Sequence, residues 1–243
     1  MKYLFFCLGL FLLLPNVCFA DEQDIADTYV QKILDSGNVT ELQKLIDNGL
    51  DVNSRDANGD TMLFYLLTHV ADLEAAQILI NAGADVNQPS SSGLTPILVA
   101  TAAAAELQNS LSSGTNSDFD VEQEIAQANM EQQKNFLIQR SLNLLKLLID
   151  NGADINQETP RGTPLMNAAT SDLNLPLVEL LLQSGAKVNQ QDRYGRTALF
   201  YAAAFGSENI STTLLKAGAD IRISDNDGRS YMEVEKNDIT DNY

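Results

Sequence analysis

Aliphatic residues recur along the chain in short clusters, each followed by a glycine. The clusters include 78–80, 144–149, 177–182 and 214–215. We expect each to form a helix that the glycine ends in a left-handed conformation, which glycine adopts without steric cost. The glycines are Gly49, Gly83, Gly152, Gly185 and Gly218, at spacings of 34, 69, 33 and 33 residues.

A second marker keeps the same period and predicts another helix before each aliphatic one. It begins with Thr or Ser, both good N-caps, and often continues with Pro, which suits a first helical turn. Pairs of small residues such as Ala168-Ala169 follow this marker, and tight turns such as 56–59 and 192–195 precede it. The aliphatic sides of such helix pairs are hidden only by stacking on the next pair. The markers begin at Thr61, Thr95, Thr163, Thr197 and Ser230, at spacings of 34, 68, 34 and 33 residues.

These motifs resemble the ankyrin-repeat family. The shared pattern is Asp-x-x-Gly-x-Thr-Pro-Leu, then Ala-Ala, Leu-Leu and Gly-Ala-Asp-Val-Asn, and the resemblance extends from about Val30 to Val234. It implies an all-α solenoid of stacked helix-turn-helix units. The family usually has a histidine after Thr-Pro-Leu, which bonds nearby loops. Here apolar residues replace it, and we expect extra apolar packing instead: Phe64, Leu98, Met166 and Phe200.

The two markers also predict the domain boundaries. Capping boxes are expected in the terminal units, from Asn38 with Glu41 and from Ser230 with Glu233. We expect a signal peptide at 1–20, an ankyrin-repeat domain at 21–234 and a polar tail at 235–243. The domain comprises an N-terminal cap at 24–55, repeats at 56–87, 88–156, 157–191 and 192–224, and a C-terminal partial unit at 225–234.

The second repeat is longer than the family period, and its excess lies in an insertion at 102–140. We expect both helices of this repeat to be extended into an antiparallel arm with a Ser/Gly/Asn tip at 112–117, because few residues after Val121 oppose helix. Asp120 and Gln123 suggest a further capping box. A disordered loop is the alternative, favoured by the Gln-rich stretch 123–133. Insertions in solenoids often map to a functional face, so the arm is a candidate contact element. The residues expected to face each other along the arm are Ala100, Ala104, Leu107 and Leu111 on one side and Val121, Ile125 and Ala128 on the other.

The first twenty residues have the layout of a signal peptide: Lys2, an apolar run at 3–14, and a small residue, Ala20, at the expected cleavage point. The run is shorter than the about 20 residues of a membrane span. An uncleaved anchor remains the alternative, and Val17 before Cys18 disfavours a lipoprotein. The cysteines, Cys7 and Cys18, both lie in this leader, which excludes disulfides and thiolate zinc sites from the mature chain. We expect export to a bacterial periplasm, or secretion.

The chain is acidic, with 15 basic and 33 acidic residues and a formal net charge of −18. A field of this sign repels nucleic acid and anionic lipid and favours a basic protein partner. Solubility alone is the alternative explanation of the charge. We expect a monomer whose mature chain does not insert into membranes.

No motif in the sequence predicts a catalytic, metal or cofactor site. His69 is the only histidine, so a histidine pair for metal is excluded, and no Gly-x-Ser-x-Gly elbow accompanies it. The turn 225–228 resembles part of a calcium loop but lacks the distal glutamate. We therefore expect no enzyme activity and no cofactor.

The family resemblance implies protein binding through turn tips and the exposed face of the first helices. Tyrosine and arginine are frequent at the centre of interfaces. Three roles stay open: a periplasmic interaction module, an immunity-type inhibitor of a toxin, and a secreted effector that binds a host protein. The candidate contact residues are Arg55, Asp56, Asn58, Tyr65, His69, Ser91, Arg161, Asn167, Arg193, Tyr194, Tyr201 and Asp225.

Overall fold

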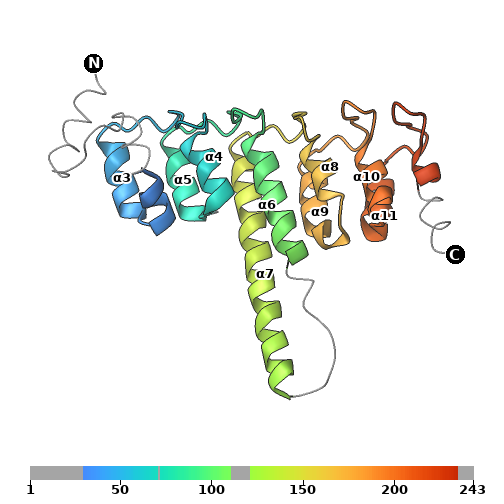
Figure 1. Cartoon of the computed structure of the whole chain (residues 1–243), viewed down its shortest axis with the longest axis horizontal. Coiled ribbons are helices and arrows are strands. Elements are labelled where there is room, and N and C mark those ends of the chain that lie inside the picture. Colours follow the sequence, from blue (N-terminus) through green and yellow to red (C-terminus); the bar gives the residue numbers. More distant parts are fainter. Residues whose placement is uncertain (1–29, 71, 111–120, 235–243) are drawn as a thin grey trace. The chain divides into compact units, whose positions relative to one another are not determined.

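The computed structural model describes residues 30–70, 72–110 and 121–234, which form two compact units divided after Pro96 (Figure 1). The expected signal peptide, the start of the cap and the polar tail lie outside the described residues. In the described ranges the regular elements are helices, and the turns between them carry isolated bridging pairs such as Arg55 with Thr61.

The N-terminal unit consists of helix pairs. Residues 30–36 are helical and precede α3 (Val39–Asp47), and α4 (Met62–His69) pairs with α5 (Leu73–Asn81). Helix α5 packs against both α3 and α4. The core of this unit is aliphatic and includes the fully buried Leu34, Leu42, Leu63, Leu66 and Leu79.

The C-terminal unit continues the same pairing. Helix α9 packs against α7 and α11, and α8 packs against α10, so neighbouring pairs cover each other's aliphatic sides. Ala168 and Ala169 are fully buried, as expected of small residues that allow close packing. The elements are α6 (Pro96–Ser110), α7 (Val121–Asp150), α8 (Pro164–Ala168), a 3-10 turn η1 (Asp172–Asn174), α9 (Leu175–Gln183), α10 (Ala198–Ala204) and α11 (Glu208–Lys216), followed by a helical turn at 231–234.

Most of the predicted helix ends are confirmed. Thr61, Thr163 and Thr197 each accept a hydrogen bond from the backbone N–H three residues later. The prediction is wrong at Thr95, whose buried Oγ1 has no hydrogen-bond partner in the part of the chain that the structure describes. The glycines after the second helices have φ between 86° and 96°, as predicted: Gly49, Gly83, Gly152, Gly185 and Gly218.

The apolar residues at the expected histidine position are buried, and asparagine side chains bond successive loops. The four residues at the histidine position are all 8 % exposed or less. An asparagine ladder bonds successive loops: in each case the side chain donates to one carbonyl and accepts from one N–H of the next repeat. The ladder joins Asn53 to Gly83 and Asp85, Asn156 to Gly185 and Lys187, and Asn189 to Gly218 and Asp220.

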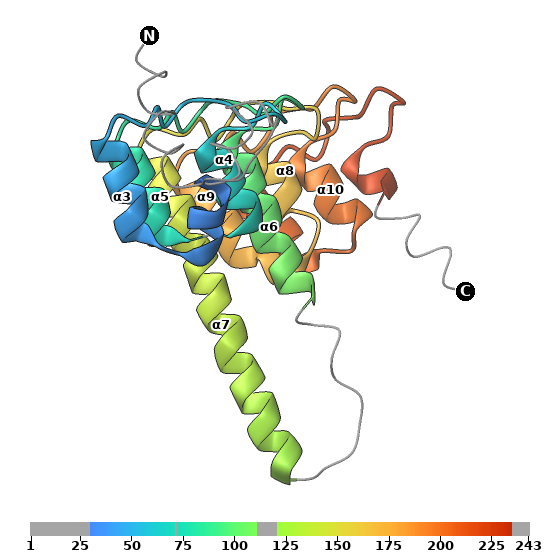
Figure 2. The same cartoon turned by 60° about the vertical axis from the view of Figure 1, so that its left-hand side comes forward.

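The described parts of the insertion, 102–110 and 121–140, are helical, as predicted. Helix α7 has 30 residues against nine in α9, and it projects beyond the other helices of its unit in both views (Figures 1 and 2). Its last turns are buried at Leu144, Leu145 and Leu148, whereas Phe136 is 66 % exposed. The first helix, α6, ends at Ser110, and the predicted tip and the capping residue Asp120 lie outside the described residues. The side chains expected to face each other, from Ala104 onward, are not described either.

No helix in the described ranges is long and apolar enough to span a membrane.

Candidate protein-interaction surface

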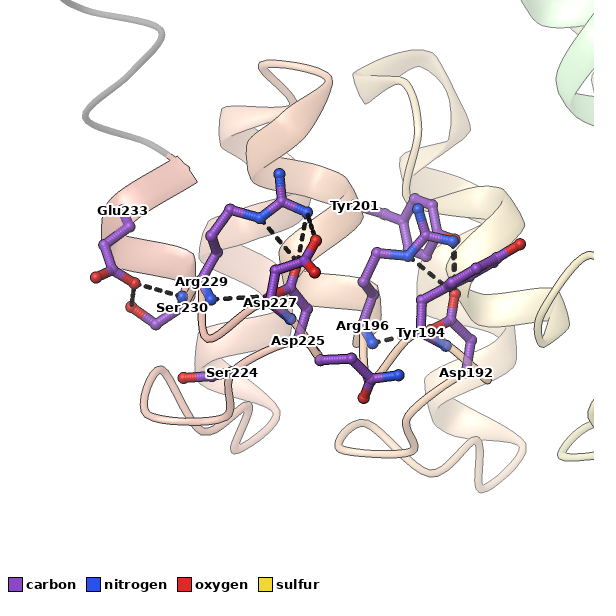
Figure 3. Close-up of polar contacts among 12 residues, drawn as sticks. Asp192, Tyr194, Arg196, Tyr201, Ser224, Asp225, Asp227, Arg229, Ser230 and Glu233 are labelled. Carbon is purple, nitrogen blue, oxygen red and sulfur yellow. Dashed lines mark hydrogen bonds and ion pairs between the residues drawn. The ribbon is translucent and has the colours of Figure 1, made fainter.

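The turn at 192–196 is organised around a buried carboxylate. Asp192 is 9 % exposed and accepts hydrogen bonds from the backbone N–H groups of Tyr194 and Arg196, both at 2.9 Å. The Arg196 guanidinium forms an ion pair with the same carboxylate, at 3.1 Å from Nε and 2.9 Å from Nη2 (Figure 3). Because the aspartate bonds the backbone of its own turn in this way, it restrains the conformation of the turn.

The hydroxyl of Tyr201, on α10, also donates to Asp192, at 2.8 Å. Burial by itself would raise the pKa of Asp192, but the bonds from Arg196 and Tyr201 outweigh it and lower that pKa below its usual value. Burial and the neighbouring carboxylate raise the pKa of the Tyr201 phenol to about 12. The neutral phenol and the ionised carboxylate therefore stabilise each other.

Aromatic rings and guanidinium groups stack around this carboxylate. The Arg196 guanidinium carbon lies 4.4 Å from the ring centroid of Tyr194 and 4.7 Å from that of Tyr201 (Figure 3). The Arg193 guanidinium carbon lies 4.7 Å from the same Tyr194 centroid, and Arg193 donates to the Tyr194 hydroxyl at 2.7 Å. Tyr194 is 47 % exposed, so the stack presents an aromatic ring to solvent.

The following turn holds this stack from one side. The backbone N–H of Asn226 donates to the Tyr194 carbonyl at 2.8 Å, and its side chain donates to the Arg193 carbonyl at 3.0 Å. Gln191 bridges the two turns through the carbonyls of Gly195 and Ser224. These bonds fix the position of the 192–196 turn within the C-terminal unit.

The structure corrects the expectation for Asp225. This residue is 7 % exposed, and its carboxylate accepts from the backbone N–H groups of Asp227 and Arg229 and from the Arg229 guanidinium (Figure 3). Asp225 therefore stabilises its turn, as Asp192 does, and does not present a contact to a partner. Of the other candidates in this unit, Arg161 is exposed and Asn167 on α8 is half-buried.

In the N-terminal unit the structure brings Tyr65 and His69 together. Their rings stack with centroids 4.3 Å apart, and the Tyr65 hydroxyl donates to Asp35 at 3.1 Å. Burial, followed by the bond to Asp35, raises the pKa of Tyr65. His69 is exposed, and its Nδ1 lies 2.6 Å from the Thr68 hydroxyl.

The predicted tip residues of this unit mainly hold their own turns. The Arg55 guanidinium donates to the carbonyls of Gly59 and Pro89, and the Asp56 carboxylate accepts from the backbone N–H of Asn58. Asn58 and Ser91 are exposed. These residues shape the tips, and only their outward faces are accessible to a partner.

Three residues that organise the Tyr194 stack and the Tyr65–His69 pair were not predicted from the sequence. Arg196 stacks between two tyrosines, Asn226 bonds two carbonyls of the neighbouring turn, and Asp35 accepts from Tyr65. A signal for Arg196 exists in the sequence, because an arginine follows the turn aspartate by four residues at both 192–196 and 225–229.

In the described residues no group of three or more His, Cys, Asp or Glu side chains is arranged to hold a metal ion.

Part of the chain is similar to known ankyrin repeats. A family model described as ankyrin repeats, in three copies, matches residues 136–225, which include the 192–196 turn. The chain is also 39 % identical over 57 residues to a putative ankyrin repeat protein, FPV233, of fowlpox virus (strain NVSL). This segment covers 23 % of the chain and 11 % of the viral protein. The predicted all-α ankyrin-repeat fold class is thus confirmed, and proteins built from such repeats generally mediate protein–protein interaction.

Proposed function

We propose that this chain is a non-enzymatic interaction module, exported to the periplasm, that binds a protein partner through its turn tips and first-helix faces. The observation that carries the proposal is the stack at the 192–196 turn. It exposes Tyr194 and Arg193, the residue types most often central to interfaces, on a turn already fixed by hydrogen bonds. The net charge of −18 speeds the encounter with a basic partner at low salt.

Affinity purification of the tagged, exported protein from its native cells tests this proposal. We expect a partner that the wild type retains and that a Tyr194→Ala variant releases at equal thermal stability. Phe205→Ala is the matched control, because Phe205 is an aromatic residue that is 61 % exposed and follows the last residue of α10, at the opposite end of that helix from the turn. Equal retention of the partner by all three proteins would exclude the turn surface as the binding site.

Export is tested separately, by fractionation and by N-terminal sequencing of the purified chain. A mature chain that begins near Asp21 in the periplasmic fraction supports cleavage after Ala20. A full-length chain in the membrane fraction contradicts it and favours an uncleaved anchor.

An immunity-type inhibitor of a periplasm-acting toxin is the second candidate function. It is favoured by the projecting helix α7 and by the net negative charge, which together suit blocking a basic active site. A toxin gene beside this gene, and loss of toxin neutralisation when the insertion is deleted, would favour it. Finding the mature chain in culture medium would instead favour a secreted effector that binds a host protein.

A further inference from the structure

The 192–196 turn is a local exception to the acidic character of the chain. It carries two arginines and one aspartate, whereas the turns 55–60 and 225–229 each carry one arginine and two aspartates. Residues 157–234 as a whole hold seven of the 15 basic residues and only nine of the 33 acidic ones. The surplus positive charge at this turn therefore needs its own explanation.

Arg193 carries that surplus charge. The Asp192 carboxylate is already paired with Arg196, and in the part of the chain that the structure describes no ion pair involves Arg193. One N–H of Arg193 bonds the Tyr194 hydroxyl, so the exposed guanidinium retains further donors. The planar fork of an arginine matches a carboxylate with two parallel hydrogen bonds.

The surroundings hold this arginine and its aromatic neighbour ready for a ligand. Asn226 bonds the carbonyls of both Arg193 and Tyr194, and Arg196 stacks against the Tyr194 ring. The backbone at Gly195 approaches Asn226 so closely that an added Cβ would lie 2.7 Å from its Oδ1. A ligand that binds here orders little new structure, which lowers the entropic cost of binding.

We infer that Arg193 and Tyr194 form a recognition site for an aspartate or glutamate side chain carried by a segment of the protein partner. The inference rests on the proposed interaction function and adds the chemistry of the contact. Arg193 binds the carboxylate, Tyr194 packs against the apolar part of the segment, and Arg196 positions Tyr194. A partner that is basic overall is attracted by the net negative charge of the chain, and one acidic segment of that partner binds the positive Arg193 site.

The test uses a display library of short random peptides, selected against the immobilised full chain. The selection is run on the wild type, on Arg193→Gln and on Lys216→Gln, a control that removes an exposed cation from the last turn of α11. We expect peptides rich in Asp or Glu to be enriched on the wild type and on the control, and to lose that enrichment on Arg193→Gln.

A double-mutant cycle on one enriched peptide then measures the contact itself. We expect Arg193→Gln, or an acid-to-amide change in the peptide, to raise Kd about tenfold or more. The two changes together should cost scarcely more than either alone, because both remove the same contact. Additive losses would overturn the inference even if Arg193→Gln weakens binding, since they would mean that the arginine acts only on the shape of the turn.

The remaining outcomes separate this inference from the proposed function. Peptides enriched without acidic residues, or bound equally by Arg193→Gln, would overturn the inference and leave the interaction function standing. No enrichment above bare beads on any of the three proteins would overturn the inference, and the affinity purification described above decides the interaction function separately.

Discussion

Two arginine–aspartate pairs at equivalent positions of successive turns have different neighbours. Arg196 is 28 % exposed and lies between two tyrosine rings, whereas Arg229 is 53 % exposed and lies 5.9 Å from the ring of Phe200. Position 194 is tyrosine in one turn, and its equivalent in the other is Asp227. A single residue therefore decides which turn offers an aromatic contact.

Gly195 shows how closely the two turns approach each other. Its φ is +78°, and a Cβ there would lie 2.7 Å from Asn226 Oδ1 and 3.1 Å from the carbonyl carbon of Asp225. We expect Gly195→Ala to lower the free energy of unfolding by about 2 kcal/mol or more, from backbone strain and from this overlap together. Urea denaturation measures the loss.

Gly228 is the matched control for that variant. It occupies the same place in the next turn with φ +83°, and a Cβ there would meet no atom of the structure within 4 Å. Gly228→Ala should therefore cost only the strain, about 1 kcal/mol. Equal losses in the two variants would show that the approach of the turns has no energetic consequence.

The Tyr201 phenol predicts a dependence of stability on alkaline pH. Its pKa rises from 10.0 to about 12 on folding, so the folded state favours the neutral phenol that donates to Asp192. This contribution is complete below pH 10 and is lost as the pH rises from 10 to 12. We expect the stability difference between the wild type and Tyr201→Phe to shrink over that range. A difference that stays constant would mean that the hydroxyl bond does not favour the neutral phenol.

At the scale of elements, helix α11 is capped by a residue of the preceding repeat. The carboxylate of Asp172, in η1, accepts from the backbone N–H groups of Asn209 and Ile210 and from the Asn209 side chain, at 2.9 to 3.2 Å. The residue at the N-cap position, Ser207, makes no side-chain cap bond. A contact between repeats thus takes over the role that a local side chain has at α3 and α5.

This arrangement predicts opposite results for two substitutions. We expect Asp172→Ala to lower the free energy of unfolding by about 1–2 kcal/mol, because it removes the cap and a favourable charge at the helix N-terminus. Ser207→Ala should be neutral or slightly stabilising, because the buried Ser207 hydroxyl has no partner among the described residues. Thermal unfolding of both variants checks the pair, and a larger loss for Ser207→Ala would contradict the assignment.

At the scale of the whole molecule, the last turns of helix α7 belong to the core of their repeat, and the rest of the helix projects beyond it (Figure 1). Among the side chains of α7 that the structure describes, the buried leucines lie in the last turns, at Leu144, Leu145 and Leu148. We expect deletion of residues 107–139 to remove helical circular dichroism and leave Tm nearly unchanged, because the pairs α8–α9 and α10–α11 keep their contacts. An unchanged helical signal would mean that the insertion is not helical in solution, and a large fall in Tm would make it part of the core.

The sequence by itself determined the repeating helix pairs. Thr61, Thr163 and Thr197 cap helices, and the glycines of the loops take positive φ, because both effects depend on residues within one turn of each other. The helical insertion was also predictable, since residues 121–149 contain few that oppose helix. Such local preferences are set by neighbours along the chain.

Only the tertiary structure decided which polar residues hold the turns together and which face solvent. Asp225 and Tyr194 both lie in predicted turns, but one is buried under an arginine and the other is 47 % exposed. Asp172 caps a helix 37 residues later in the chain, which no local pattern indicates. These roles depend on groups brought together from successive repeats, and a buried carboxylate is stable only where such groups satisfy it.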